Sequence, residues 1–208
     1  MIGIVDYGMG NLYSVSKALE RMDVDYVITD DQRLLKQAKG LILPGVGAFK
    51  DAMAILNDRG LTTFLKDCTQ QRKPLLGICL GMQLLFDESE ENGLSEGLGL
   101  IKGRVVRFPQ NEAYKIPHMG WNKLHVHQPS SLLEGVNNGY VYFVHSYYVQ
   151  AGEQSDVIAS SEYAVDVPAV VGKGNVFGTQ FHPEKSSDTG LRILENFAAV
   201  VEGKVLSS

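Results

Sequence analysis

The stretch KPLLGICLGMQLLF, residues Lys73–Phe86, places one cysteine between two glycines, with an apolar run before it. Residues 75–78 predict a short buried strand, and the apolar pattern from Met82 to Phe86 predicts the start of a helix. A residue on the bend between such a strand and helix is strained and exposed, and small neighbours let the two elements approach closely. This is the geometry of a nucleophile elbow, written G-x-S-x-G for serine, and here it is Gly77-Ile78-Cys79-Leu80-Gly81. We therefore expect Cys79 to be a nucleophile.

The composition is ordinary for a soluble globular protein. The chain has 208 residues, of which 44% are hydrophobic and 21% charged, and its formal net charge is -5. This acidic balance argues against nucleic-acid binding, for which a basic face is typical. No apolar run approaches the roughly 20 residues of a membrane span, and the opening MIGIVDYGMG lacks the pattern of a signal peptide. We expect no nucleic-acid or membrane partner and a cytoplasmic location.

The two cysteines differ in their surroundings. They cannot form a disulfide framework, and a cytoplasmic setting keeps them reduced. Cys68 lies in a predicted helix, where a small half-buried hydrophobic residue is the favoured interpretation. That interpretation usually holds for an isolated cysteine. The flanking glycines and the strand–helix junction distinguish Cys79 from it.

Short strands alternate with helical patterns in the first half of the chain. Strands are predicted at residues 2–7, 25–29 and 40–45, and helices at residues 12–22, 49–56 and 61–70. This alternation predicts a parallel sheet with helices on both faces.

After about residue 97 the pattern changes to short strands separated by turn residues. These strands are predicted at residues 103–108, 123–127, 139–150, 156–160, 167–172 and 175–181, before a last helix over residues 189–201. We therefore predict an α/β fold with an open, mainly parallel twisted sheet and antiparallel strands in the C-terminal half. Since no repeat or linker interrupts the chain, residues 1–208 are expected to form a single domain.

A cysteine nucleophile needs a base that takes the thiol proton, and the base needs an orienting partner. The segment TQFHPEKS, residues 179–186, supplies a candidate pair. In an extended chain His182 and Glu184 project to the same side, and Pro183 stiffens the turn between them. A carboxylate beside an imidazole fixes the ring tautomer and stabilises its charged form. Alone this pair would be an ordinary surface His and Glu, but with the elbow cysteine it predicts a Cys79–His182–Glu184 triad.

The oxyanion that forms during acyl transfer also needs hydrogen-bond donors. The backbone N–H of Leu80, at the start of the helix after the elbow, is one candidate. A second is the loop PGVGAF, residues 44–49, in which Gly45 and Gly47 let the amides turn toward a neighbouring site. A plain strand-to-helix turn with glycines is the competing interpretation of this loop. Gln83, one helical turn after the cysteine, can reach the same site.

The segment DYGMGNLY resembles a dinucleotide fingerprint. It places Gly8-x-Gly10 between a strand and a helix, and Asp30 and Asp31 follow further along the chain. Its third glycine position holds Tyr13, which is too bulky for close helix–strand packing. We therefore expect no NAD, and interpret the loop as an exposed turn that contacts a partner.

The histidines raise the question of a metal site. His125 and His127 lie two apart, and His118 and His145 lie elsewhere in the chain. No third ligand stands at a recognisable spacing for zinc, so histidines on solvated strands are the favoured interpretation. We expect neither a metal nor any other cofactor.

The motifs G-I-C-L-G, P-G-V-G and the late H-P-E together resemble the class I (triad) glutamine amidotransferases, over essentially the whole chain. DYGMGN, PGVGAF and PHMGWN (residues 117–122) resemble one branch of that family, whose members supply ammonia to a separate (β/α)8-barrel cyclase in histidine biosynthesis. FVHSYY, residues 143–148, fits this branch as well, and its position 146 is serine where threonine also occurs in the family. The resemblance implies a subunit that hydrolyses L-glutamine through a cysteine thioester and forms a heterodimer with the cyclase subunit.

The resemblance also implies roles for residues outside the triad. The oxyanion would be held by the Leu80 amide and by an amide of the loop near Val46. Residues implied to bind glutamine are Gly47, Gln83, Ser146 and Tyr147, and those implied near the partner interface are Asn11, Trp121, Tyr142 and Lys185. Because glycine tolerates φ of either sign, the loop can also turn a carbonyl toward the oxyanion site. The isolated subunit is therefore expected to be a poor glutaminase that the cyclase and its substrate switch on.

Two other functions compete with this interpretation. One is a glutaminase subunit of another pathway, such as pyridoxal phosphate synthesis, or a cysteine hydrolase related to γ-glutamyl hydrolase. DYGMGN and PHMGWN speak against both. The other is a non-catalytic binding subunit on the same fold. Such proteins usually lose the cysteine or the histidine, whereas Cys79, His182 and Glu184 are all present here.

Overall fold

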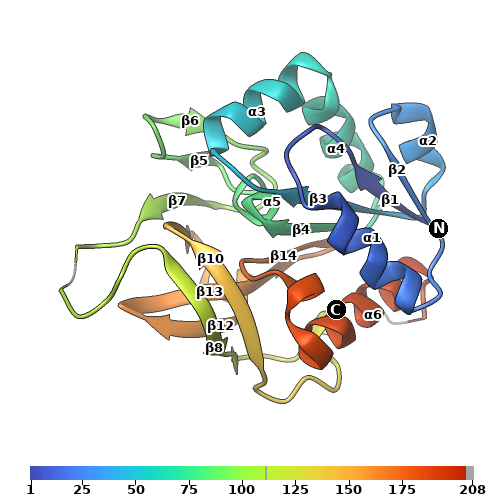
Figure 1. Cartoon of the computed structure of the whole chain (residues 1–208). Coiled ribbons are helices and arrows are strands. Elements are labelled where there is room, and N and C mark those ends of the chain that lie inside the picture. Colours follow the sequence, from blue (N-terminus) through green and yellow to red (C-terminus); the bar gives the residue numbers. More distant parts are fainter. Residues whose placement is uncertain (111, 205–208) are drawn as a thin grey trace.

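An eight-stranded twisted sheet crosses the molecule, and helices lie on both of its faces (Figure 1). The computed structural model describes residues 1–110 and 112–204. The strands follow in the order β2 (Tyr26–Thr29), β1 (Ile2–Val5), β3 (Gly40–Gly45), β4 (Leu75–Cys79), β14 (Val176–Thr179), β13 (Val165–Lys173), β12 (Val157–Tyr163) and β9 (His125–Val126). Neighbours run parallel from β2 to β14 and antiparallel from β14 to β9. The predicted fold class is confirmed.

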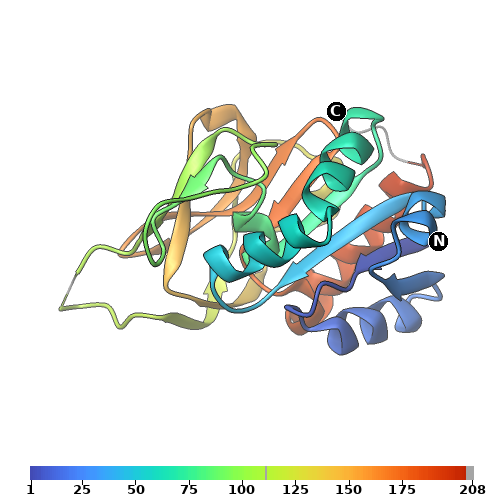
Figure 2. The same ribbon diagram turned by 90° about the horizontal axis from the view of Figure 1, so that it is seen from above.

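Each face of this sheet packs against its own set of helices. Helices α1 (Leu12–Arg21) and α6 (Ser187–Val201) cover one face, and α2 (Gln32–Gln37), α3 (Phe49–Asp58) and α4 (Leu61–Gln70) cover the other (Figure 2). Val15 and Leu19, four residues apart on α1, have no exposed surface and pack in one apolar layer with Phe197 of α6. Burial of such apolar stripes is what holds amphipathic helices on a sheet. Helix α2 was not predicted.

Two smaller sheets lie beside the main one. The first runs in the order β11 (Tyr147–Ala151), β7 (Gly103–Arg107), β5 (Glu88–Ser89) and β6 (Ser95–Glu96), and the second pairs β10 (Tyr140–His145) with β8 (His118–Lys123). The strand run predicted over residues 139–150 therefore divides at Ser146, and its two halves pair with different strands. No strand was predicted over β8. Three 3₁₀ turns, η1 (Ser131–Leu133), η2 (Gln154–Asp156) and η3 (Pro183–Lys185), complete the described elements.

The helix that follows the cysteine differs from its prediction. It begins at once, as α5 (Leu80–Gln83), and ends after four residues instead of running from Met82 to Phe86. The carbonyls of Leu84, Leu85 and Phe86 accept hydrogen bonds from the amides of residues 98–101. Since those carbonyls are engaged by a distant segment, they do not accept bonds from a further helical turn. Across the described parts of the chain, no helix is both long and apolar enough to span a membrane.

Candidate active site

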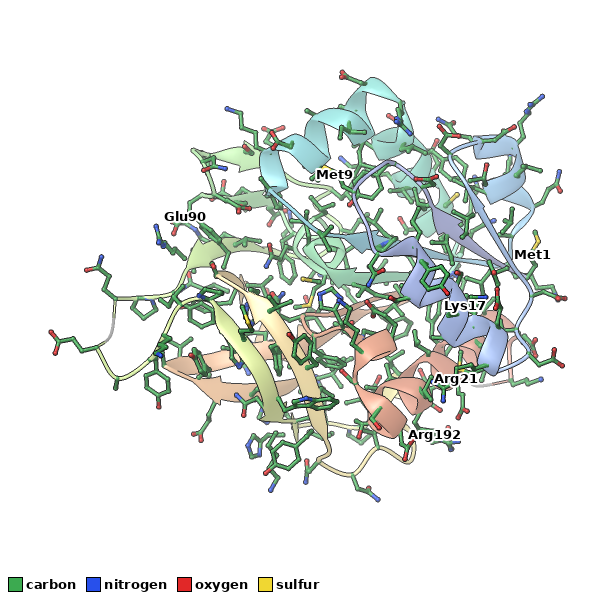
Figure 3. All side chains as sticks on the ribbon, in the orientation of Figure 1. Met1, Met9, Lys17, Arg21, Glu90 and Arg192 are labelled. Carbon is green, nitrogen blue, oxygen red and sulfur yellow. The ribbon has the colours of Figure 1, made fainter. Side chains whose placement is uncertain are left out.

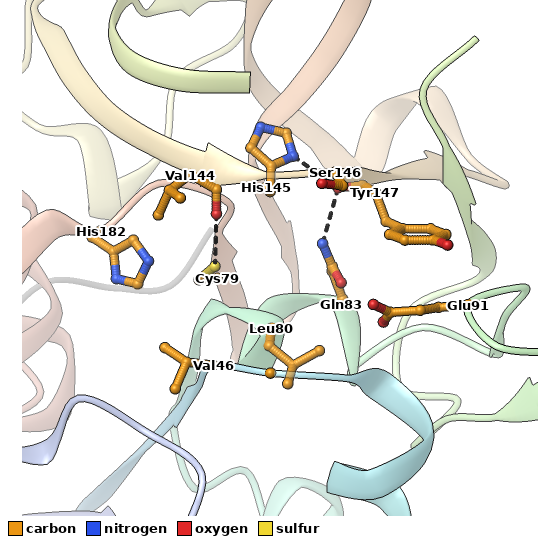
Figure 4. A pocket seen from close by; sticks show the side chains of 11 residues that line it. Val46, Cys79, Leu80, Gln83, Glu91, Val144, His145, Ser146, Tyr147 and His182 are labelled. Atoms are coloured by element: carbon orange, nitrogen blue, oxygen red, sulfur yellow. Dashed lines mark hydrogen bonds between the residues drawn. The ribbon is translucent and has the colours of Figure 1, made fainter. Parts of the chain in front are cut away.

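Cys79 stands on a strained bend between β4 and α5 (Figure 4). Its backbone has φ 55° and ψ -113°, a conformation that few non-glycine residues adopt. The flanking glycines are required by close approach of the backbone. A Cβ atom at Gly77 would lie 2.5 Å from the carbonyl oxygen of Gly81, and one at Gly81 would lie 1.8 Å from the carbonyl oxygen of Leu43. The elbow geometry is therefore present, but the expected exposure of the cysteine is wrong, because its side chain is buried at 7% exposed.

His182 and Glu184 meet in a tight turn at the end of β14. The Nδ1 atom of His182 lies 2.8 Å from Oε1 of Glu184, and both side chains are buried. An extended chain was predicted here, but the pair lies on η3, which brings residues two apart together by its own curvature. The His182 amide donates to the carbonyl of Tyr142 at 3.0 Å, and the Ser186 hydroxyl donates to the His182 carbonyl at 2.6 Å. The turn is thus held on both sides.

The charge on His182 is strongly stabilised by its neighbours. Burial opposes the charged ring, but hydrogen bonding to Cys79 and to Glu184, together with their negative charges, raises the pKa of His182 from 6.5 to about 10. A carboxylate accepts hydrogen bonds and does not donate them, so Nδ1 of His182 carries a proton. The other ring nitrogen, Nε2, is then the atom that exchanges a proton with the sulfur. The arrangement can hold a thiolate beside an imidazolium.

The sulfur has two further neighbours that were not anticipated from the sequence. The carbonyl oxygen of Val144 lies 4.0 Å from Sγ of Cys79 (Figure 4), and Nε2 of Gln180 lies 3.9 Å from the same sulfur. Gln180 lies within the segment of residues 179–186 that supplied the predicted His182–Glu184 pair, and its side chain is fully buried. An amide N–H aimed at sulfur favours the thiolate form.

A pocket of about 380 Å³ opens over the cysteine, within the size range of small-molecule sites. Its lining residues are Val46, Gly47, Cys79, Leu80, Gln83, Glu91, Val144, His145, Ser146, Tyr147 and His182. The structure therefore brings together every residue that was predicted to bind substrate or hold the oxyanion. Glu184 lies behind His182 and does not line the pocket.

Gln83 is held in place by both hydrogens of its side-chain amide. Its Nε2 donates to the Tyr147 carbonyl at 3.0 Å and to Oε1 of Gln180 at 3.1 Å. This leaves Oε1 of Gln83 as the atom that can accept a hydrogen bond from a bound molecule. The buried side chain thus has a defined orientation next to the cysteine.

Glu91 is a pocket residue that the sequence analysis missed. Its Oε2 accepts a hydrogen bond of 2.9 Å from the amide of Phe49, the first residue of α3. A carboxylate is stabilised at a helix N-terminus, where N–H groups lack partners within the helix. The acidic run DESEEN offered no signal, because 42 positions separate the two residues and only the fold joins them.

The two predicted oxyanion donors are in different states. Leu80 opens α5, so its amide is among the first-turn N–H groups with no acceptor inside the helix. The amide of Val46 instead donates to the carbonyl of Met9 at 3.3 Å, on the loop after β1 (Figure 3). Gly47, next to it, has φ 103°, a conformation that suits glycine. In this conformation the second donor is engaged away from the site.

The prediction that the histidines lie on solvated strands was wrong for His118 and His145. These side chains are 2% and 7% exposed, and Nδ1 of His118 lies 2.9 Å from Nε2 of His145. His125 is half-buried, and the exposed His127 forms a hydrogen bond of 2.6 Å with the hydroxyl of Ser160. Within residues 1–110 and 112–204, no three His, Cys, Asp or Glu side chains form a cluster that could hold a metal ion. Cys68, on α4, is buried.

The residues predicted near a partner interface lie on elements that contact one another. Turn η3, which carries the exposed Lys185, contacts both α1 and β10. Asn11 caps α1 through its side chain, and Trp121 of β8 is 54% exposed, with its ring 6.0 Å from that of Tyr142 on β10. Lys185 also lines a hollow with Lys17 of α1, whose position Figure 3 shows.

Comparison with known proteins agrees with this geometry. The family model of glutamine amidotransferase class-I matches residues 3–201. A crystal structure of a glutamine amidotransferase has the same fold, with a TM-score of 0.77 and 20% identity over 97% of this chain and 98% of that one. PurLQS from Thermotoga maritima has a TM-score of 0.73 and 20% identity over 96% of this chain and 98% of that one. The chain belongs to the class I glutamine amidotransferase family and is an enzyme of that class.

Similar sequences narrow the assignment within that family. The imidazole glycerol phosphate synthase subunit HisH of Geobacillus sp. (strain WCH70) is 65% identical, over 98% of this chain and 99% of that protein. The subunit of the same name from Bacillus subtilis (strain 168) is 56% identical over 95% of both chains. The chain belongs to the imidazole glycerol phosphate synthase subunit HisH family. This confirms the predicted function, the glutaminase subunit of that synthase.

Proposed function

We propose that Cys79, His182 and Glu184 form the catalytic triad with which this chain releases ammonia from L-glutamine. The observation that carries the proposal is the strained Cys79 on its elbow, next to an imidazole whose Nδ1 lies 2.8 Å from a buried carboxylate. The nucleophile, the base and the group that orients the base thus stand in the order that thiol catalysis needs. The eight-stranded sheet that joins both halves of the chain supports our proposal that it acts as a single domain.

The first chemical step is attack of the Cys79 thiolate on the side-chain amide carbon of glutamine. The thiolate forms because the thiol proton passes to Nε2 of His182, whose charge Glu184 stabilises. The carbonyl double bond opens, and its oxygen takes the negative charge. The N–H of Leu80 stabilises that oxygen at the start of α5.

The second step releases ammonia and leaves a thioester. The C–N bond breaks as the oxyanion collapses, and the proton on Nε2 of His182 passes to the leaving nitrogen. A water molecule then gives a proton to Nε2 of His182 while its oxygen attacks the thioester carbon, and the C–S bond breaks. Glutamate leaves, and the free Cys79 thiol is restored with its proton returned from His182.

The pocket provides for the rest of the glutamine molecule. Glu91 supplies a carboxylate on the wall of the pocket, and the α-ammonium group of glutamine is the cationic part of the substrate. Oε1 of Gln83 accepts a hydrogen bond from the side-chain amide. Gly47, Ser146 and Tyr147 line the remaining wall with backbone groups.

The partner in this proposal is a (β/α)8-barrel cyclase subunit, which takes the ammonia without release to bulk water in histidine biosynthesis. The face formed by α1, η3 and the β8–β10 sheet supports this, because it combines exposed aromatic and basic side chains. Trp121, with Tyr142 beside it, is the kind of aromatic anchor that dominates protein interfaces. Asn11 and Lys185 lie on the adjoining elements.

Binding of this partner also switches the glutaminase on. In the lone chain the Val46 amide donates to Met9, so one oxyanion donor is missing, and a lost donor costs on the order of a hundredfold to a thousandfold in rate. Met9 lies in the DYGMGN loop that leads into α1, next to the partner face. Contact of the cyclase with this loop separates the two groups, and the glycines on either side of Val46 let the peptide turn.

The test measures glutamate formation by the chain alone, with the cyclase, and with the cyclase and its bound substrate. The expected result is weak activity alone and a rise of roughly a hundredfold or more in the full complex. Full activity from the lone chain would contradict the switch. Cys79→Ala should abolish glutamine hydrolysis while the complex still forms and still makes product from ammonium salt. Glutamine-dependent synthesis by Cys79→Ala would refute the triad.

A further inference from the structure

Two buried histidines, one of which lines the pocket, take no part in the chemistry described above. His118 is on β8 and His145 is on β10, and the pairing of these strands places them opposite each other. Nδ1 of His118 lies 2.9 Å from Nε2 of His145. The His118 ring lies between two aromatic rings, Phe143 at 4.5 Å and Tyr163 at 3.9 Å, with interplanar angles of 21° and 14°. Its plane is therefore held without help from its hydrogen bonds.

The hydrogen bonds of this pair run in one direction. Nδ1 of His145 lies 2.7 Å from the carbonyl oxygen of Tyr147, which can only accept, so Nδ1 carries the hydrogen (Figure 4). In a neutral ring Nε2 is then an acceptor, and Nδ1 of His118 must donate to it. Nε2 of His118 in turn accepts from Nδ2 of Asn122 at 3.3 Å. Nδ2 is the donor end of that side chain, because it also donates to the Glu162 carbonyl at 2.9 Å.

Both rings are neutral at ordinary pH. Burial lowers the pKa of His118 from 6.5 to about 4. Burial also lowers the pKa of His145 to about 3, and the charges of His118 and His182 add to that effect against the Tyr147 carbonyl. A neutral ring has one donor and one acceptor nitrogen. Each ring therefore accepts one hydrogen bond from the Asn122 side and donates one toward the Tyr147 carbonyl. The Asn122 amide at one end and the Tyr147 carbonyl at the other therefore fix the tautomers of both rings.

The chain of bonds ends in the substrate pocket. The Tyr147 carbonyl accepts from His145 and also from Nε2 of Gln83, whose second hydrogen goes to Gln180. Nε2 of Gln180 lies 3.9 Å from the sulfur of Cys79. If His145 did not donate, the Tyr147 carbonyl would keep Gln83 as its side-chain partner, and one of the two side-chain bonds that fix its orientation at the pocket wall would be lost.

We propose that His118 and His145 are positioning residues, whose directed pair of hydrogen bonds holds the Tyr147 peptide and Gln83 in the orientation that binds glutamine. This rests on the proposed function of the pocket. Neither histidine touches the reacting atoms in this proposal. Their effect falls on the affinity for glutamine and reaches the site only through the Tyr147 carbonyl.

The test compares His118→Phe and His118→Asn in the complex with the cyclase and its substrate. Phenylalanine keeps the stack between Phe143 and Tyr163 but neither donates nor accepts, whereas asparagine keeps a donor near Nδ1. We expect His118→Phe to raise the KM for glutamine about threefold to tenfold with kcat nearly unchanged, as loss of one hydrogen bond predicts. His118→Asn should recover at least half of that loss. His127→Phe, at a hydrogen-bonded histidine outside the pocket, is the matched control and should leave both constants unchanged.

A second measurement tests the pair without reference to catalysis. Ring-nitrogen chemical shifts of the ¹⁵N-histidine-labelled chain should show both rings neutral at pH 7, with the hydrogen on Nδ1. An Nε2–H tautomer in either ring, or a KM for His118→Phe within twofold of wild type, would overturn the proposal. If His118→Phe does not fold, the ring tautomers of the wild-type chain and the KM of His118→Asn decide whether the proposal holds. Failure of glutamine hydrolysis in the wild-type complex, with ammonium-dependent synthesis intact, would instead refute the proposed function.

Discussion

Replacing Glu184 with glutamine tests how the buried carboxylate acts on the imidazole. The two side chains are nearly equal in shape, so the packing around the 3% exposed His182 is kept. The amide of glutamine can present either its oxygen or its NH₂ group to Nδ1 of His182. The oxygen keeps the ring tautomer but lacks the negative charge. The NH₂ group forces the hydrogen onto Nε2, and the ring can then no longer take the thiol proton.

The size of the effect follows from the charge on His182. The difference between a pKa of 6.5 and one of about 10 favours the charged ring by on the order of 5 kcal/mol, which Cys79 and Glu184 supply together against burial. Half of that energy corresponds to a factor of roughly one hundred in the equilibrium constant between the charged and the neutral ring. A wrong tautomer costs up to about 10⁴ in a serine protease triad. We therefore expect Glu184→Gln to lower kcat by a factor between about 10² and 10⁴.

The assay is glutamate formation in the complex with the cyclase and its substrate, at saturating glutamine. Ammonium-dependent synthesis by the same sample should be unchanged, which shows that the chain is folded and bound. Glu195→Gln is the matched control, because Glu195 is a half-exposed residue of α6 that pairs with Arg192. A kcat for Glu184→Gln within about tenfold of wild type would refute the reasoning, since the carboxylate would then contribute little to the base.

Three further predictions follow from buried groups. An electrophilic glutamine analogue should label Cys79 at least about tenfold faster than Cys68, because burial raises the pKa of the Cys68 thiol. Peptide mapping that finds Cys68 labelled first would contradict this prediction. Tyr7→Phe should lower the free energy of unfolding in urea by about 1–3 kcal/mol, because the Tyr7 side chain is only 1% exposed and its hydroxyl donates to the Pro44 carbonyl at 2.9 Å. Tyr13→Phe, at a 73% exposed residue, is the control and should change the free energy of unfolding by less than about 0.5 kcal/mol. Because the pKa of His182 is raised to about 10, its contribution to stability is complete below pH 6.5 and is lost as the pH rises through about 10. The unfolding free energy of wild type minus that of Glu184→Gln should therefore decrease from pH 6.5 to pH 10, and an increase over that range would show that the charge is not stabilised.

The amino-acid sequence alone determined the features that depend on neighbours within a few residues. Gly77, Cys79 and Gly81 predict the elbow because the bend needs small residues on both sides of the nucleophile. A Cβ at Gly77 would strike the nearby Gly81 carbonyl, whereas one at Gly81 would strike the Leu43 carbonyl of the neighbouring strand β3. The parallel sheet was predictable for a similar reason, since alternating strand and helix patterns are local. The early end of helix α5 was not predicted, because residues 98–101 take the carbonyls that a longer helix would have used.

The residues of the candidate site likewise divide into those with a local sequence signal and those that only the fold places there. Cys79, His182 and Gln83 carried local signals or matched family motifs, and the structure places them together, while their roles remain proposals. Glu91 gave no signal, because its place at the start of α3 depends on the fold, which brings the segment between β5 and β6 to the first residue of that helix. Gln180 was also missed, although it lies two residues before His182.

Only the tertiary structure decided which histidines pair and which amide is engaged. His118 and His145 are 27 positions apart, and they meet because the antiparallel register of β8 and β10 sets them opposite each other. A shift of one residue in that register would turn each ring to the other face of the sheet. The bond from Val46 to Met9 likewise joins two loops that share nothing in sequence. Glycines show that such a loop can turn, but its orientation is set by the Met9 carbonyl, which the pairing of β1 with β3 brings next to Val46.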